Sequence, residues 1–147
     1  MKVLFVYPNH IGVNMLPTGV ALLSACLKRE GYKIKLFDTT YYSEASYTND
    51  SNGTKQKSGY KTGSTDGNKI DRLMARPVKK GNYNITVKHS NIFEDFRKEV
   101  LDFDPELIAM SCTEDMFHLG IKLINKVKYL KIPTLVGGVF PTFAPRL

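Results

Sequence analysis

Few residues of this chain belong to the types that carry covalent chemistry. Its two cysteines are Cys26 and Cys112, and His10 or His118 could serve Cys112 as the base of a nucleophilic pair. No third member stands at a diagnostic spacing, so we interpret Cys112 as a buried structural cysteine and expect no catalytic residue. Two cysteines are too few for a disulfide scaffold or for an iron–sulfur cluster held by three or four thiolates.

Small, polar and hydroxyl residues, which suit binding better than covalent chemistry, gather in segments 9–18, 111–115 and 137–142. The pair Gly137-Gly138 would let a flat ligand approach the main chain closely, and a plain strand-ending turn explains it as well. The chain has no Walker-type G-x-x-x-x-G-K-[ST] loop and no G-x-G-x-x-G dinucleotide pattern. These segments therefore predict a ligand site outside the common nucleotide-binding motifs.

Regular elements must position these segments, and the hydrophobic pattern locates four strands. Apolar runs predict buried strands at 3–7 and 107–111, and an alternating run predicts a half-buried or edge strand at 33–38. A fourth strand is predicted at 133–136, stopped by Gly137-Gly138. Strand, helix and strand follow one another within the first forty residues, which is typical of a βαβ unit.

Three helices are predicted between these strands. The first is capped by Thr18, has its apolar positions at Val20, Leu23 and Leu27, and stops at Gly31. The second starts at the Asn91 cap, with Glu94 three residues later, and ends at Asp104-Pro105. The third begins at the acidic turn 112–115. Its apolar face is expected to hold Phe117, Ile121, Ile124 and Val127.

The alternating order predicts a three-layer α/β fold, Rossmann-like or flavodoxin-like, with a parallel sheet in the order 2-1-3-4. We expect one domain over 1–147, incomplete before a fifth strand, with residues 139–147 forming an interrupted loop. Segment 43–68 contains no Leu, Ile, Val, Phe or Met, which predicts a flexible polar insertion. In such sheets ligands bind at the carboxyl ends of the strands, between strands 1 and 3. The first strand ends in Tyr7-Pro8-Asn9, without the carboxylates of a receiver domain.

The charge is basic, with 21 Lys and Arg against 14 Asp and Glu and a net charge of +7. The basic residues are scattered from Lys2 to Arg146, so we expect no nucleic-acid partner. No apolar stretch approaches the ~18 residues of a membrane span, and no signal-peptide pattern follows Met1. We therefore expect a cytoplasmic protein without membrane contact. An exposed sheet edge would allow a dimer.

Several stretches resemble the N-terminal domain of cobalamin (vitamin B12)-binding radical-SAM proteins. They are KVLFVYPN (2–9), LPTGVALLSACLKREGY (16–32), KLFD (35–38), PELIAMS (105–111) and PTLVGGVFPTFAP (133–145). The last is the most specific, because the family commonly carries Gly-Gly, a short spacer and then Pro-Thr. The resemblance implies a Rossmann-like domain that holds cobalamin, followed by a radical-SAM barrel as partner domain. That barrel would carry the S-adenosylmethionine and 4Fe-4S sites.

The resemblance also implies roles for single residues. Ser111 and Thr113 would contact the nucleotide tail or corrin, Gly137 and Gly138 would line the tail, and Pro17, Thr18 and Gly19 would face the corrin. Around these positions, the three ligand-facing loops add further expected contacts: Asn9, His10, Cys112, Glu114, Val139, Pro141 and Thr142. The D-x-H-x-x-G motif of classical cobalamin domains is incomplete around His10, so we expect no cobalt ligand and no other metal ligand from this chain.

Two functions follow as expectations. The first is a cobalamin-binding module of a radical-SAM methyltransferase, or of a cyclase similar to the anaerobic magnesium-protoporphyrin monomethyl ester enzyme. The chain alone would then bind cofactor without catalysing a reaction. The alternative is a cofactor-free, flavodoxin-like interaction or sensory domain.

Overall fold

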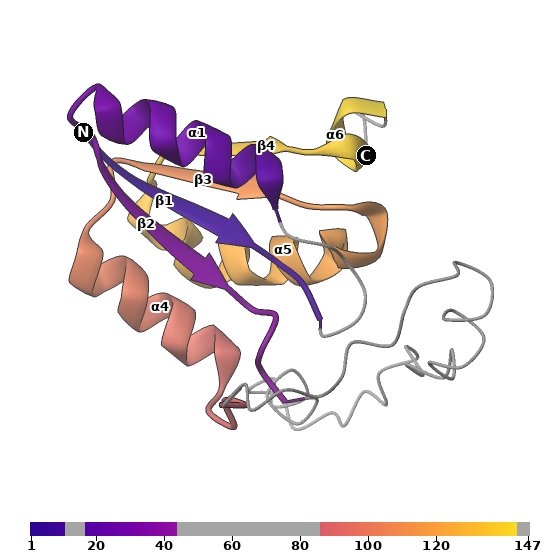
Figure 1. Ribbon diagram of the computed structural model, residues 1–147. Coiled ribbons are helices and arrows are strands. Elements are labelled where there is room, and N and C mark those ends of the chain that lie inside the picture. Colours follow the sequence, from indigo (N-terminus) through magenta and orange to yellow (C-terminus); the bar gives the residue numbers. More distant parts are fainter. Residues whose placement is uncertain (11–16, 44–85, 144–147) are drawn as a thin grey trace.

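The structure, a computed structural model, describes residues 1–10, 17–43 and 86–143. In chain order the elements are β1 (Lys2–Tyr7), α1 (Thr18–Arg29), β2 (Lys33–Asp38), α4 (Ile92–Phe103), β3 (Leu107–Ser111), α5 (Glu114–Val127), the 3-10 turn η1 (Lys128–Leu130), β4 (Thr134–Gly137) and α6 (Val139–Phe143). The strands form one parallel sheet in the order β2-β1-β3-β4 (Figure 1). The α/β flavodoxin-like prediction is confirmed.

The central strand β1 organises both layers of the fold. Every residue from Val3 to Tyr7 is at most 8% exposed, because β2 and β3 pair with its two sides and helices cover its two faces. Side chains alternate between the faces of a strand. Leu4 and Val6 belong to the large core, whereas Val3 and Phe5 pack with Val20 of α1. The prediction of a first strand buried on both faces is therefore confirmed.

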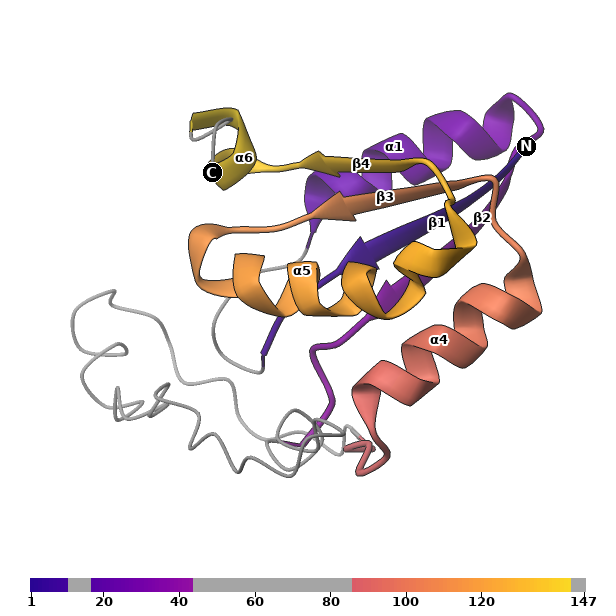
Figure 2. The same ribbon diagram turned by 180° about the vertical axis from the view of Figure 1, so that it is seen from behind.

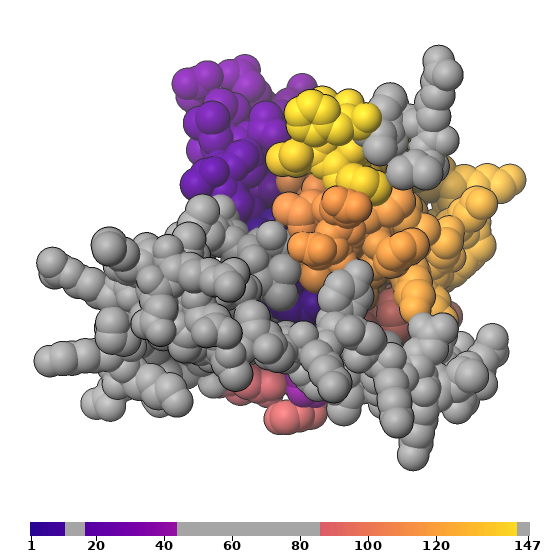
Figure 3. All heavy atoms as spheres, turned by 90° about the vertical axis from the view of Figure 1, so that its right-hand side faces the viewer, coloured from indigo at the N-terminus to yellow at the C-terminus, as the bar shows by residue number. Residues whose placement is uncertain are grey.

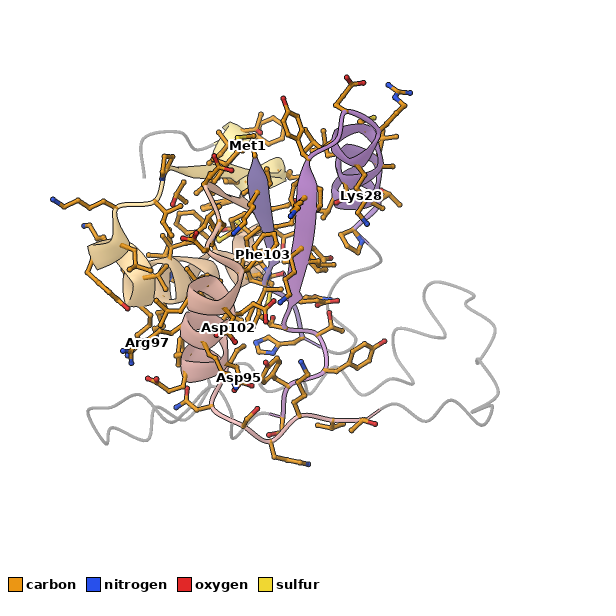
Figure 4. All side chains as sticks on the ribbon, turned by 90° about the vertical axis from the view of Figure 1, so that its left-hand side faces the viewer. Met1, Lys28, Asp95, Arg97, Asp102 and Phe103 are labelled. Carbon is orange, nitrogen blue, oxygen red and sulfur yellow. The ribbon has the colours of Figure 1, made fainter. Side chains whose placement is uncertain are left out.

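The large core lies between the sheet and the helices α4 and α5, which cover the face opposite α1 (Figures 1 and 2). The ring of Phe96 on α4 meets Phe37 of β2 edge-to-face at 5.0 Å between centroids. Figure 4 shows Phe103 on the inner side of α4, while Arg97 projects away from the body of the molecule. The Lys35 ammonium lies 5.7 Å from the centroid of the Phe103 ring, in a cation–π contact between β2 and the C-terminal end of α4.

The buried face of α5 differs from the expected one. The fully buried positions are Met116, Gly120, Leu123 and Val127, whereas Phe117, Ile121 and Ile124 are only partly buried beside the core. The reason is tertiary. A Cβ at Gly120 would collide with the Met110 side chain and lie 3.1 Å from Pro8 Cγ, so the glycine lets α5 pack closely onto the sheet.

Three helix ends test the predicted caps. The Asn91 Oδ1 accepts the backbone N–H groups of Phe93 at 2.9 Å and Glu94 at 3.2 Å, which confirms the predicted start of α4. Gly31 follows α1 with φ +80° and donates its N–H to the Lys28 carbonyl, as predicted for a stop. The Thr18 cap was wrong, because Pro17 occupies the N-cap position and Thr18 is already helical, without a side-chain capping bond.

The last described segment also departs from expectation. Val139–Phe143 forms the short helix α6 instead of an interrupted loop. Phe140 meets Phe117 of α5 at 5.0 Å between ring centroids, and the Thr142 hydroxyl donates to the Gly138 carbonyl at 2.7 Å. A packing contact with a distant helix therefore fixes a turn that local sequence did not reveal.

The residues on either side of segment 44–85 contact each other and α4. Tyr42 and Lys88 form a parallel bridge, and the Tyr42 hydroxyl donates to the Asp95 carboxylate of α4 at 2.9 Å. Apart from Ser43, the predicted polar insertion 43–68 lies outside the described residues. No helix among the described ranges is long and apolar enough to cross a membrane.

Replacing Asn91 by alanine should lower the free energy of unfolding by about 1 kcal/mol, because two N–H groups of α4 lose their acceptor. Urea unfolding followed by circular dichroism measures this loss. Asn125→Ala is the matched control, since Asn125 is exposed within α5, and it should change stability by less than about 0.5 kcal/mol. Equal losses in the two variants would contradict the capping role.

Candidate functional site

The carboxyl ends of the four parallel strands gather at one edge of the sheet. The strands end at Tyr7, Asp38, Ser111 and Gly137, and α1 begins at the same edge because it runs back along the sheet. Figure 3 looks onto this end, with α1 on one side and α6 and the start of α5 on the other. This is where open parallel sheets bind ligands.

Ser111 and Gly137 come together across β3 and β4. They are register partners. Ser111 comes two residues after Ala109 in β3, and Gly137 comes two residues after Leu135 in β4, the register partner of Ala109. Ala109 packs against the small core under α1, which places it on the α1 face of the sheet. Because alternate residues of a strand share a face, Ser111 and Gly137 also lie on the α1 side. Both are half-buried.

Gly19 lines the same side from the first turn of α1. In a right-handed crossover from β1 through α1 to β2, a residue one position before the sheet-facing Val20 lies on the side of α1 nearest β3. Gly19 is exposed, and a Cβ placed on it would meet no atom within 4 Å. Gly19, Ser111 and Gly137 therefore lie on the same side of the sheet, at the ends of β3 and β4.

Gly138 has a structural explanation that needs no ligand. Its φ is +107°, and a Cβ at this position would collide with the Cys112 carbonyl and lie 3.0 Å from the Cys112 nitrogen. The Cys112 N–H donates to the Gly137 carbonyl at 3.2 Å, so the loops after β3 and β4 lie backbone against backbone. Only glycine fits such an approach without strain.

Cys112 lies under this contact and is 3% exposed. Burial raises the pKa of the Cys112 thiol, which keeps it protonated and poorly nucleophilic. His118 is exposed on α5 beside Phe117. The burial predicted for Cys112 is confirmed.

Acidic residues occupy the start of α5. Thr113 is the half-buried N-cap residue, and Glu114 and Asp115 are exposed in the first turn. Their carboxylates complement the positive end of the helix dipole. They also oppose the binding of a phosphate at this helix N-terminus.

At the carboxyl ends of β1 and β2, hydrogen bonds join the two loops that follow these strands. Asn9 is 2% exposed, and its N–H donates to the Thr39 hydroxyl at 2.7 Å while that hydroxyl donates to the Asn9 carbonyl at 2.8 Å. The Asn9 side-chain amide donates to Thr40, whose hydroxyl donates to Asp38. Asn9, one of the expected ligand contacts, thus joins the loops that follow β1 and β2.

Other residues at the ends of β1 and β2 were not predicted from sequence. Tyr7 is 8% exposed, and burial, with a smaller effect of the nearby Asp38 carboxylate, raises the pKa of its phenol. The polar run Asp38-Thr39-Thr40 directly after β2 was the available signal for the Asn9 network.

The expected contacts differ in accessibility. Asn9 and Cys112 are buried. The half-buried ones are His10, Pro17, Ser111, Thr113, Gly137 and Pro141. The exposed ones are Thr18, Gly19, Glu114, Gly138, Val139 and Thr142. The accessible contacts thus lie on α1 and around the ends of β3 and β4.

Within the described ranges, no group of three or more His, Cys, Asp or Glu side chains is arranged to hold a metal ion. The chain matches no protein-family model, no curated protein and no solved structure.

Gly138 and Gly19 should respond oppositely to replacement by alanine. Gly138→Ala should lower the free energy of unfolding by about 1–3 kcal/mol, because its φ is positive and Cys112 leaves no room for a Cβ. Gly19→Ala should leave stability unchanged or raise it by up to about 1 kcal/mol, because its Cβ enters open space on a helix. Denaturant midpoints decide between them, and a tolerated Gly138→Ala would refute the packing explanation.

The two thiols should react with iodoacetamide at different rates in the folded protein. Cys26 is exposed, whereas Cys112 is buried and its raised pKa leaves a smaller thiolate fraction at any given pH. Peptide mass spectrometry should show Cys26 labelled first and Cys112 labelled only after denaturant is added. Comparable native labelling of both would show that Cys112 is accessible.

Proposed function

We propose that this chain binds cobalamin at the carboxyl ends of its strands, as the cofactor module of a radical-SAM methyltransferase or cyclase. The resemblance of residues 1–40 and 92–146 supports this function. One structural observation carries it furthest: Ser111 and Gly137 lie on the same sheet face as the open side of Gly19. The expected contacts from three separated segments thereby border one region.

The residues around this region suit the parts of cobalamin. The flat benzimidazole of the nucleotide tail would lie against Gly137, and a hydroxyl such as that of Ser111 can donate a hydrogen bond to the tail phosphate. The exposed Glu114 and Asp115 would turn the phosphate away from α5 and toward β3. The corrin would lie over Thr18 and Gly19, where α1 leaves space.

Cobalamin would supply the cobalt that carries a methyl group, and the protein would supply binding and orientation. His10 is half-buried beside the Asn9 network, and we assign it no cobalt bond. Ser111 and Thr113 would hold the tail, and α1 would shield one side of the corrin from water. Catalysis would require the barrel domain of the radical-SAM family.

A cofactor-free interaction domain is the second candidate, and a different observation favours it. Large apolar side chains are exposed on α1, β4 and α6, including Leu22 at 67%, Leu135 at 62% and Phe143 at 83%. Exposed apolar patches often mark interaction surfaces. In that case Gly138 and Asn9 have the structural roles described above.

Hydroxocobalamin should change its visible spectrum in the presence of the protein and co-elute with it on a desalting column. Gly19→Phe should lower the affinity at least about tenfold, equivalent to 1.4 kcal/mol, because a ring at this position fills the open side of α1. The affinities of the parent chain and the variant can be measured by absorbance titration of hydroxocobalamin. Quenching of tyrosine fluorescence gives a second measurement, because the chain contains no tryptophan.

Ala25→Phe is the matched control, because it adds the same ring to an exposed position two turns along α1 and away from the strand ends. It should bind hydroxocobalamin like the parent chain. Failure of the parent chain to bind would refute the proposed function and favour the interaction domain. Equal weakening by both variants would place the ligand elsewhere.

A further inference from the structure

β4 is an edge strand of the sheet within the described residues, and its backbone shows which groups point outward. The carbonyls of Pro133 and Gly137 accept the N–H groups of Ile108 and Cys112, respectively. Because the backbone groups of a strand alternate in direction, Thr134 and Val136 direct both their N–H and C=O groups away from β3. This edge thus offers two donors and two acceptors.

The two edges of the sheet differ in charge. β2, at the opposite edge, carries Lys33 and Lys35 exposed among its six residues, and lysines on an edge strand hinder pairing with another strand. β4 has the sequence Thr-Leu-Val-Gly and no charged residue. The protection found at β2 is therefore missing at β4.

An apolar side chain marks the centre of the β4 edge. Leu135 continues a row across the α1 face that runs through Leu36, Phe5 and Ala109 by register. Phe5 is buried against Val20 of α1, whereas Leu135 is 62% exposed. Among the described residues, none covers Leu135, the residue at the β4 end of this row.

We propose that a second copy of this chain pairs with β4 in antiparallel orientation, about a two-fold axis through Leu135 and perpendicular to the sheet. In this register Thr134 lies opposite Val136 of the other copy, and the pair exchanges two N–H···O=C bonds on each side of the axis. All four outward groups of each strand are then used. The two Leu135 side chains lie directly opposite one another on the same face.

The self-complementary register favours a second copy over an unrelated strand. A two-fold axis perpendicular to the sheet keeps the α1 faces of both copies on one side, so Leu135 meets an apolar partner. Cβ atoms of such directly opposed residues lie about 4.5–5.5 Å apart. The contact is small and each chain carries a net charge of +7, so the dimer is weak and depends on concentration.

Sedimentation equilibrium of the full chain, from micromolar to millimolar concentration at high ionic strength, tests the association. The parent chain should shift from the mass of one chain toward twice that mass. Thr134→Pro should remain a monomer, because proline removes an outward N–H without touching the bonds to β3. Thr134→Val, which keeps the N–H, is the matched control and should still dimerise. Circular dichroism checks that all variants fold.

Cysteine cross-linking tests the register. In a Cys26→Ser background, Leu135→Cys should form a disulfide-linked dimer under mild oxidation, because the opposed positions are close enough for a disulfide. Thr134→Cys should not, because its copies would lie diagonally, about 7–8 Å apart. Non-reducing electrophoresis separates the two results.

A parent chain that stays monomeric throughout the concentration range would overturn the proposal. A dimer that survives Thr134→Pro, or that cross-links through Thr134→Cys and not through Leu135→Cys, would also overturn it. None of these results depends on cobalamin, since Leu135 lies in the middle of β4 and the ligand contacts lie at its carboxyl end.

Discussion

The burial of β1 is the constraint on which the rest of the structure depends. This strand forms backbone pairs on both sides and packs against helices on both faces, so Val3 to Tyr7 have no exposed side. A strand of this kind needs a continuous apolar sequence and covering layers above and below. The positions of β2, β3, α1 and the α4/α5 pair are consequences of that need.

The two covering layers are unequal, and the surface properties of the molecule follow from the difference. On one face, α4 and α5 cover a large core that includes Phe37 of β2 and Val127 at the end of α5. On the other, Val20 of α1 packs on Val3 and Phe5, with Ala109 only partly buried beside them. Among the described residues, β4 is therefore less covered than β1 on the α1 side, and Leu135 is 62% exposed there. The residues expected to contact a ligand lie at the carboxyl ends of β3 and β4, and Leu135 lies at the edge of the sheet.

Much of the fold could be predicted from the sequence, because strong local signals coincide with the burial that the sheet requires. The apolar run at β1, the Asn91 cap and the Gly31 stop all lie where they were expected. The site was predicted only as a set of loops. Local sequence could not show that Asn9 would be buried against Thr39, because the two residues are separated by a helix and a strand.

The sequence by itself determined the order of elements, since hydrophobic periodicity and helix-ending residues are local properties. The tertiary structure decided which face of α5 is buried, because the close contact of Gly120 with Met110 sets the rotation of the helix. It also decided that α6 forms, through the contact of Phe140 with Phe117. In each case the deciding contact joins residues that lie on different elements, so no local pattern could contain it.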